Sequence, residues 1–199
     1  MRTFCLILFS LIVLACQAQK DRQVGGACEA CDLMYDGMPK TLSPQITIGT
    51  NEPGEPMIIE GTILKKDGKT PASDIILYVY HTDAKGYYSN LPNEKGNRHG
   101  HLRGWLKTGA DGKYKFTTIR PAQYPSETIP AHVHPLIKEP GLSLYWIDEY
   151  LFDDDQYLTE DEKKRQEKRG GNGIIHLTKK DGVWQGQRDI VLGKNIPGY

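Results

Sequence analysis

The sequence predicts an all-β protein, an antiparallel β-sandwich with one short helical insertion and an irregular N-terminal lead-in. Short apolar segments with alternating polarity recur along the chain, and Asp-Gly pairs follow several of them, a pattern typical of strands joined by tight turns. The 21 glycines and 12 prolines among 199 residues favour many turns over long helices. A chain of this length fits one domain.

The expected strands begin after residue 56, where a polar, proline-containing segment ends. Tyr114 and Phe116 alternate with Lys115 and Thr117, which is the period of a half-buried strand. Strands are expected over residues 57–64, 75–81, 102–108, 113–119, 131–138, 142–152, 173–178 and 183–192. The turn at 109–112 predicts a hairpin between the strands that flank it, and Asp181-Gly182 predicts another.

One segment, 159–169, has a helical pattern. Its sequence, TEDEKKRQEKR, carries acids first and bases last, an order that suits the helix dipole. It has no apolar stripe, so we expect a solvated insertion rather than a binding helix.

The charge balance excludes some classes of function. Lys and Arg number 25 and Asp and Glu also number 25, whereas a nucleic-acid binder needs a basic excess to displace counterions from phosphates. With 38% hydrophobic residues the chain can bury a core, which excludes disorder as its main state.

The first fifteen residues read as an export signal. Arg2 precedes an apolar run that is too short to span a bilayer, which needs about 20 residues. The run ends in VLAC, which resembles the lipobox of bacterial lipoproteins and predicts lipid on Cys16; an ordinary signal peptide with a chance cysteine is the alternative. We therefore expect a signal peptide over 1–15, a tether and lead-in over 16–56 and a domain over 57–199. Such a protein is lipid-anchored in the cell envelope, with the outer membrane expected and its periplasmic or surface face left open.

Cys28 and Cys31 form a Cys-x-x-Cys pair. Such a pair can be a structural disulfide, a redox dithiol or half of a zinc site. The sequence has no second pair to complete a zinc site and no βαβ pattern after the first. Export to an oxidising compartment favours a disulfide that holds the N-terminal segment.

His132-Val133-His134 lies in an expected strand, where alternate side chains point to the same face, so both imidazoles can reach one point. Tyr124 precedes this pair, and Tyr87-Tyr88 follows an expected strand end. Each of these residues alone has an ordinary structural alternative, as a surface or hydrogen-bonded histidine or a core tyrosine. A second pair, His99 and His101, lies in a Gly-rich segment and reads as a solvated or substrate-facing loop, and His81 reads as a structural hydrogen-bonding residue.

Five segments together resemble the intradiol ring-cleavage dioxygenases, of the catechol and protocatechuate dioxygenase kind. In family order they are YHTDAKGYY at 80–88, Arg103-Gly104, TGADGKYKF at 108–116, TIRPAQYP at 118–125 and PAHVH at 130–134. The resemblance covers roughly residues 58–152 and implies a non-haem iron(III) enzyme that opens catechol-type rings between the two hydroxyls.

The resemblance also implies the site residues. The family iron is held by two tyrosines and two histidines, which fall on Tyr88, Tyr124, His132 and His134; Tyr87 is the rival for the first position, and the spacing after Gly86 selects Tyr88. Tyr88 and Tyr124 are the residues given a catalytic role, and Tyr124 is the ligand that substrate displaces. The implied cofactor is Fe(III), the partners are a small aromatic diol and O2, and the product is a muconate-type diacid.

The chain departs from the family pattern at two places. Ile129 occupies the position where family members commonly carry an arginine, and Arg120 or Arg103 is the candidate replacement. The long N-terminal helical region of the soluble catechol enzymes is absent, which predicts a monomer or weak homo-oligomer. Two other functions compete: a catalytically impaired β-sandwich lipoprotein that binds carbohydrate, peptide or a partner protein, and a redox lipoprotein that uses Cys28 and Cys31.

Overall fold

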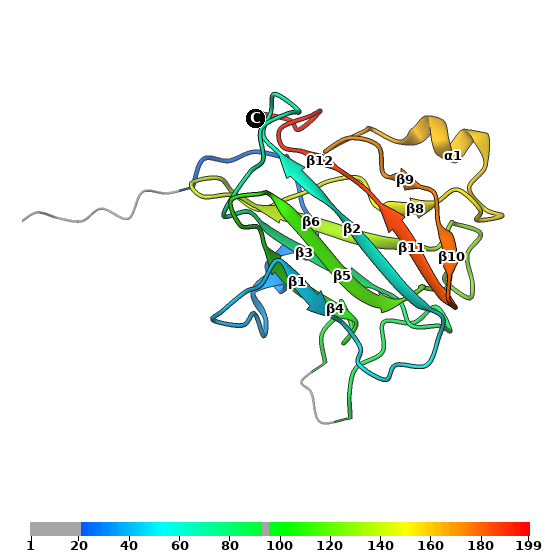
Figure 1. The fold of residues 1–199 in the computed structure, drawn as a ribbon. Coiled ribbons are helices and arrows are strands. Elements are labelled where there is room, and N and C mark those ends of the chain that lie inside the picture. The colour runs from blue at the N-terminus through cyan, green and yellow to red at the C-terminus, as the bar shows by residue number, and fades with distance from the viewer. Residues whose placement is uncertain (1–20, 93–95) are drawn as a thin grey trace, which may run out of the picture.

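The computed structural model describes residues 21–92 and 96–199 and consists of two β-sheets packed face to face (Figure 1). This confirms the predicted all-β sandwich. The predicted signal peptide and Cys16 lie outside the described residues. Within the described ranges, no helix has the length and apolar composition needed to cross a bilayer.

The first sheet is centred on two long strands whose residues alternate between core and solvent. Met57 and Ile59 are fully buried, whereas Glu60 between the core positions is exposed. In spatial order the sheet contains β1 (Gln45–Thr47), β5 (Lys113–Ile119), β2 (Pro56–Leu64), β11 (Val183–Gln187) and β10 (Thr178–Lys180), with β12 (Ile190–Val191) also paired to β2. β2 and β5 are antiparallel, while β1 on β5 and β11 on β2 are parallel, so the sheet is mixed.

The second sheet has an inner face toward the core and an outer face that carries aromatic and histidine side chains. Its order is β4 (Arg103–Lys107), β3 (Ile76–His81), β6 (His132–Lys138), β8 (Tyr150–Phe152) and β9 (Ile174–Ile175), with β7 (Tyr145–Trp146) also paired to β6. Val79, Val133 and Ile137 join the core between the sheets. Because alternate residues of a strand point to opposite faces, Tyr80 and its cross-strand partner His134 lie on the outer face.

The turn at 109–112 is not a hairpin, contrary to the prediction. β4 pairs with β3 and β5 pairs with β2, so the turn crosses from one sheet to the other. Gly112 is required there, because its φ is 66° and a Cβ would lie 2.6 Å from the Ile63 carbonyl oxygen. The hairpin predicted at Asp181-Gly182 is confirmed, since it joins the antiparallel strands β10 and β11.

The strand expected over 142–152 is two strands with a break between them. β6 pairs with β8 through His132 and Val133 and with β7 through Leu136 and Ile137. Pro135 lies between these pairs, and proline has no N–H to donate to a ladder. The break separates β7 from β8 over residues 147–149, although Ile147 still donates its N–H to the Pro135 carbonyl oxygen.

The predicted helix is confirmed in shortened form as α1 (Glu160–Arg165), which buries no side chain. The Thr159 hydroxyl caps it by accepting a hydrogen bond from the Glu162 N–H. Figure 1 shows α1 beside β8 and β9, at the edge of the second sheet.

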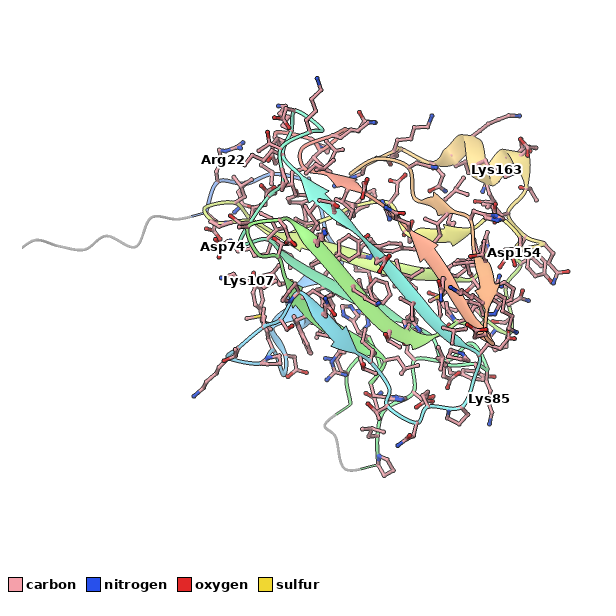
Figure 2. All side chains as sticks on the ribbon, viewed as in Figure 1. Arg22, Asp74, Lys85, Lys107, Asp154 and Lys163 are labelled. Carbon is pink, nitrogen blue, oxygen red and sulfur yellow. A yellow bond between two sulfur atoms is a disulfide. The ribbon has the colours of Figure 1, made fainter. Side chains whose placement is uncertain are left out.

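The lead-in packs on the sandwich more closely than a tether. Its 3-10 turn, η1 (Cys31–Tyr35), covers the outer face of the second sheet, where Cys31 and Met34 pack against Tyr78 and Leu136. Trp105 of β4 donates its indole N–H to the Met34 carbonyl oxygen. At the end of β4, Lys107 forms a 2.8 Å ion pair with Asp74, which precedes β3, and the two residues lie close together in Figure 2.

Candidate metal centre

The four predicted ligand side chains meet at one point. Tyr88 comes from the segment after β3, Tyr124 from the segment between β5 and β6, and the two histidines from the start of β6. The Oη atoms of Tyr88 and Tyr124 are 2.6 Å apart, and the Nε2 atoms of His132 and His134 are 3.0 Å apart. Tyr124 Oη lies 3.2 Å and 3.4 Å from these two nitrogens, and Tyr88 Oη lies 3.0 Å from Nε2 of His134.

The segment that carries Tyr88 is shaped by Asp83. Its carboxylate accepts hydrogen bonds from the N–H groups of Lys85 and Tyr87 and from the Ser89 hydroxyl. Gly86 has a φ of 85°, and a Cβ there would lie 2.0 Å from the carbonyl oxygen of Gln123, the neighbour of Tyr124. The Asp and Gly of the sequence motif therefore bring the two tyrosine-bearing segments together.

The Thr82 hydroxyl and the Asp83 carbonyl hold the same two segments from the other side. The hydroxyl donates to the Ala122 carbonyl oxygen, and the Ala122 N–H donates to the Asp83 carbonyl oxygen. These bonds fix the approach of Tyr88 to Tyr124 without help from either phenol.

The two histidines reach the cluster with the same ring nitrogen. Nδ1 of His132 lies 2.7 Å from the Pro130 carbonyl oxygen, which can only accept, so Nδ1 carries the proton and Nε2 presents a lone pair. Burial lowers the pKa of His132 to about 4, so the ring is neutral near pH 7. A metal ligand needs this neutral state.

The two phenols need a cation before they can ionise. Burial raises the pKa of Tyr88 and of Tyr124 above the ordinary phenol value, and the short contact with Tyr124 raises that of Tyr88 further. Both are therefore neutral in the absence of a positive charge, and a bound metal ion is the kind of charge that converts such groups to anionic ligands.

The donor set fits a hard, highly charged cation. A transition-metal ion such as Zn²⁺ binds nitrogen and oxygen ligands at about 2.0–2.2 Å. Two ligand atoms at right angles around such an ion therefore lie about 3 Å apart. The five distances given above, from 2.6 to 3.4 Å, match that separation. Phenolate oxygen with imidazole suits Fe(III), because a hard ion prefers an anionic oxygen donor.

Glu149 and Tyr80 support His134, a role that the sequence did not predict for either residue. The Glu149 carboxylate lies 3.6 Å from Nδ1 of His134, and the rings of Tyr80 and His134 stack with centroids 4.6 Å apart. Burial raises the pKa of Glu149, but its interaction with His134 outweighs burial and lowers the pKa to about 2. The pairing of β6 with β8 places Glu149 beside His134, a contact between segments distant in sequence that no local signal could have identified.

A cleft of about 360 Å³ opens beside the cluster. Its lining includes three of the four cluster residues, apolar side chains from the segment before β6 and from β8, and polar side chains from α1. They are Tyr124, Ile129, Pro130, His132, His134, Glu149, Leu151, Glu162 and Gln166. Ile129, at the position where an arginine was expected, is thus a wall of this cleft.

Neither candidate replacement for that arginine lines the cleft. Arg120 makes two hydrogen bonds to the Asp154 carboxylate, at 2.9 and 2.6 Å, and its guanidinium lies over the Trp184 ring. Arg103 donates to the Gly100 carbonyl oxygen. Both are therefore committed to structural contacts elsewhere.

His99 is buried, which corrects the prediction of a solvated or substrate-facing loop. Its ring stacks on Tyr80 with centroids 3.7 Å apart and planes within 7°, and its Nδ1 lies 3.0 Å from the Tyr78 hydroxyl. His101 bonds to the Ser89 carbonyl oxygen and to Glu52. The loop that contains His99 and His101 is fixed in place because these histidines contact aromatic and carboxylate side chains of other segments. His81 has the predicted structural role, bonded to the Thr82 carbonyl and the Thr118 hydroxyl.

Cys28 and Cys31 are joined by a disulfide beside the metal centre. A second, smaller cavity of about 130 Å³ lies between this disulfide and the outer face of the second sheet, and its lining includes Tyr80, His134 and Glu149. His134 and Glu149 therefore separate the cleft from a cavity that the lead-in covers.

Comparisons with known proteins agree with this geometry. A family described as "Dioxygenase" matches residues 37–171. Catechol 1,2-dioxygenase 1 of Acinetobacter lwoffii is 30% identical over 165 residues, which cover 71% of this chain and 51% of the relative. Chlorocatechol 1,2-dioxygenase of Cupriavidus pinatubonensis is 29% identical over 123 residues, which cover 54% of this chain and 47% of that protein.

Solved structures share the fold. The 3-chlorocatechol 1,2-dioxygenase of Rhodococcus opacus aligns with a TM-score of 0.60 at 18% identity, over 87% of this chain and 72% of the other. The dioxygenase domain of a dioxygenase and carbohydrate-binding fusion from a Streptomyces species aligns with a TM-score of 0.57 at 20% identity, over 78% and 91%.

Fold and site together define an all-β protein in which two histidines of the second sheet meet two tyrosines from neighbouring loops. The chain belongs to the intradiol dioxygenase family. It spans about half the length of the curated relatives it matches.

Proposed function

We propose that this chain is a ferric-iron-dependent intradiol dioxygenase that cleaves a catechol-type compound with O2 to a muconate-type diacid. The observation that carries the proposal is the convergence of Tyr88, Tyr124, His132 and His134 on one point with the spacing of a metal's ligands. The family membership supports the same reaction.

The four residues would hold the ion with two phenolate oxygens and two imidazole nitrogens. A bound ferric ion supplies the Lewis acidity that ionises both catechol hydroxyls and draws electron density from the ring. The reaction balances without another reductant: the bond between the two hydroxyl-bearing carbons breaks, and both atoms of O2 enter the product.

Tyr124 has a second role in this scheme. It lines the cleft, so its oxygen, one of the four atoms that would hold the ion, is placed to take a proton from the incoming catechol. Ile129 and Leu151 line the same cleft and form apolar walls that hold the ring and exclude water.

Conversion of either tyrosine to phenylalanine tests the proposal. Purified protein loaded with iron is expected to contain one ion per chain, to absorb visible light by phenolate-to-iron charge transfer and to take up O2 with catechol. Tyr88→Phe and Tyr124→Phe should each lose O2 uptake to below detection. Tyr87→Phe is the matched control, since that neighbouring side chain is 56% exposed.

A colourless protein without iron, or full activity in either cluster variant, would contradict the proposal. The first result would favour a sandwich that binds a ligand without catalysis.

We also propose export and lipid anchoring through Cys16. The apolar run before Cys16 and the disulfide at Cys28 and Cys31, which requires an oxidising compartment in most organisms, support this location. In a bacterial host, Cys16→Ser should move the protein from the membrane fraction to the soluble fraction and abolish incorporation of labelled fatty acid. A wild-type protein without label would overturn the anchor.

A further inference from the structure

The cleft beside the candidate metal centre is lined by acidic, apolar and histidine side chains, without a lysine or an arginine. Two carboxylates, those of Glu149 and Glu162, line it together with the Gln166 amide. The described residues that form its lining include no lysine or arginine. Glu149 and Glu162 are therefore the acidic groups that a ring substituent would meet in this cleft.

Glu162 is turned toward the cleft while its neighbours face solvent. Its side chain is 23% exposed, whereas that of Glu160 in the same helical turn is 77% exposed. The Thr159 cap fixes this orientation by holding the Glu162 N–H at the start of α1. Glu162 is paired with Arg165, whose side chain is 69% exposed, so solvent screens the positive partner more than the carboxylate. Figure 2 shows the neighbouring Lys163 at α1, on the periphery of the molecule.

The two arginines considered as replacements for the expected arginine are engaged outside the cleft. The Arg120 guanidinium donates one hydrogen bond to each oxygen of the Asp154 carboxylate. Arg103 donates a hydrogen bond to the Gly100 carbonyl oxygen. A carboxylate on the substrate ring would thus meet no lysine or arginine in the cleft lining and would lie next to carboxylates, which disfavours binding.

We propose that this cleft selects catechols whose ring substituent ends in an alkylammonium group, with Glu162 as the residue that recognises the ammonium and Gln166 as a hydrogen-bonding neighbour. The inference rests on the proposed function, because the diol end of the substrate must lie at the metal centre. Ile129 and Leu151 pack against the ring, and the substituent reaches α1. The substituent takes no part in the reaction, so the bonds broken and formed are those given above.

A pair of substrates that differ only in the charged end tests the proposal. These are 2-(3,4-dihydroxyphenyl)ethylamine and 3-(3,4-dihydroxyphenyl)propionate, with unsubstituted catechol as the reference in each variant. The iron-loaded protein should show a kcat/KM for the amine roughly tenfold above that for the acid, the size expected of a partly screened charge contact. Glu162→Gln should remove most of this ratio, and Glu160→Gln, a change of the same charge on the same helix, should leave it intact.

A binding measurement separates this inference from the proposed function. Calorimetry with 2-phenylethylammonium and 3-phenylpropionate, which have no hydroxyls to be cleaved, should give tighter binding of the ammonium compound in the wild type and not in Glu162→Gln. Cleavage of catechol with a preference for the acid, or a preference that survives Glu162→Gln, overturns the inference alone. Failure to cleave any catechol overturns the proposed function, and the calorimetric comparison still decides the charge preference.

Discussion

The two faces of the second sheet are formed by the same strands but have different roles. On the inner face Leu77, Val79, Val133 and Ile137 are fully buried against the first sheet. The outer face carries Tyr80 and the two histidines of the cluster, and its cover is the lead-in rather than another sheet. The alternation of strand side chains thus separates residues that hold the fold from residues that do chemistry, one position apart in the sequence.

The largest expected effect comes from the inner face. Ile137→Ala should lower the free energy of unfolding by about 2–5 kcal/mol, because it leaves a cavity in a close-packed core, and Ile137→Val should cost about 0.5–1.5 kcal/mol. Urea unfolding of the metal-free protein measures both. Iron content and visible absorption per folded molecule should not change, and a loss of either would show that the faces are not separable.

The second largest effect is expected on the outer face, where a substitution should lower the affinity for metal rather than the free energy of unfolding. Glu149→Gln removes the carboxylate beside Nδ1 of His134, and loss of such a partner typically costs about 10–100-fold in metal affinity. Competition with a chelator measures the affinity, with Glu160→Gln as the charge-matched control. An unchanged affinity would remove Glu149 from the metal centre.

The disulfide offers a smaller change at the cover of the outer face. It closes a very short loop, so the double variant Cys28→Ser, Cys31→Ser should lose about 2 kcal/mol or less of unfolding free energy. Because the pair lines a cavity that His134 also lines, the visible absorption band should shift while the iron content stays constant. Wild-type protein treated with a reductant should show the same shift of the visible absorption band. If the band does not shift in either sample, the lead-in that covers the outer face does not influence the site.

Mild acid should lower the free energy of unfolding through buried histidines on both faces of the sheet. The decrease should be smallest just below neutral pH and grow as the pH falls. Burial lowers the pKa of His81, on the inner face, and of His99, under the outer cover, to about 4 in each case. The unfolded chain therefore binds more protons between pH 6.5 and about 4, and the free energy of unfolding falls as the pH falls through that window. Thermal melts of the metal-free protein across this range measure it, and His81→Gln should reduce the slope. A flat profile would contradict burial of these rings.

The sequence predicts most of the fold and the main part of the site. Residue parity alone places His132 and His134 on one face, and the motif around Asp83 and Gly86 indicates the loop that presents Tyr88. Strand pairing was harder to predict from the sequence. The turn at Gly112 has the residues of a hairpin turn, but β4 pairs with the longer strand β3 and β5 with the longer strand β2, in separate sheets. Glu149 and His99 were missed because their positions depend on neighbours distant in sequence, which no local pattern reveals.

The direction of β6 sets the orientation of the cleft relative to the start of the described chain. His132 lies at one end of the strand, while Lys138 at the other end donates to the Asp21 carboxylate at 2.7 Å, and six residues at about 3.3 Å each separate these ends by about 20 Å. Figure 2 shows Arg22 and Lys85, which precedes Tyr88, at opposite ends of the molecule. The described chain therefore begins about 20 Å from the histidine end of the cleft. If the chain is tethered through Cys16, as proposed, this separation predicts that proteolytic release from the tether leaves turnover of a dissolved catechol unaltered.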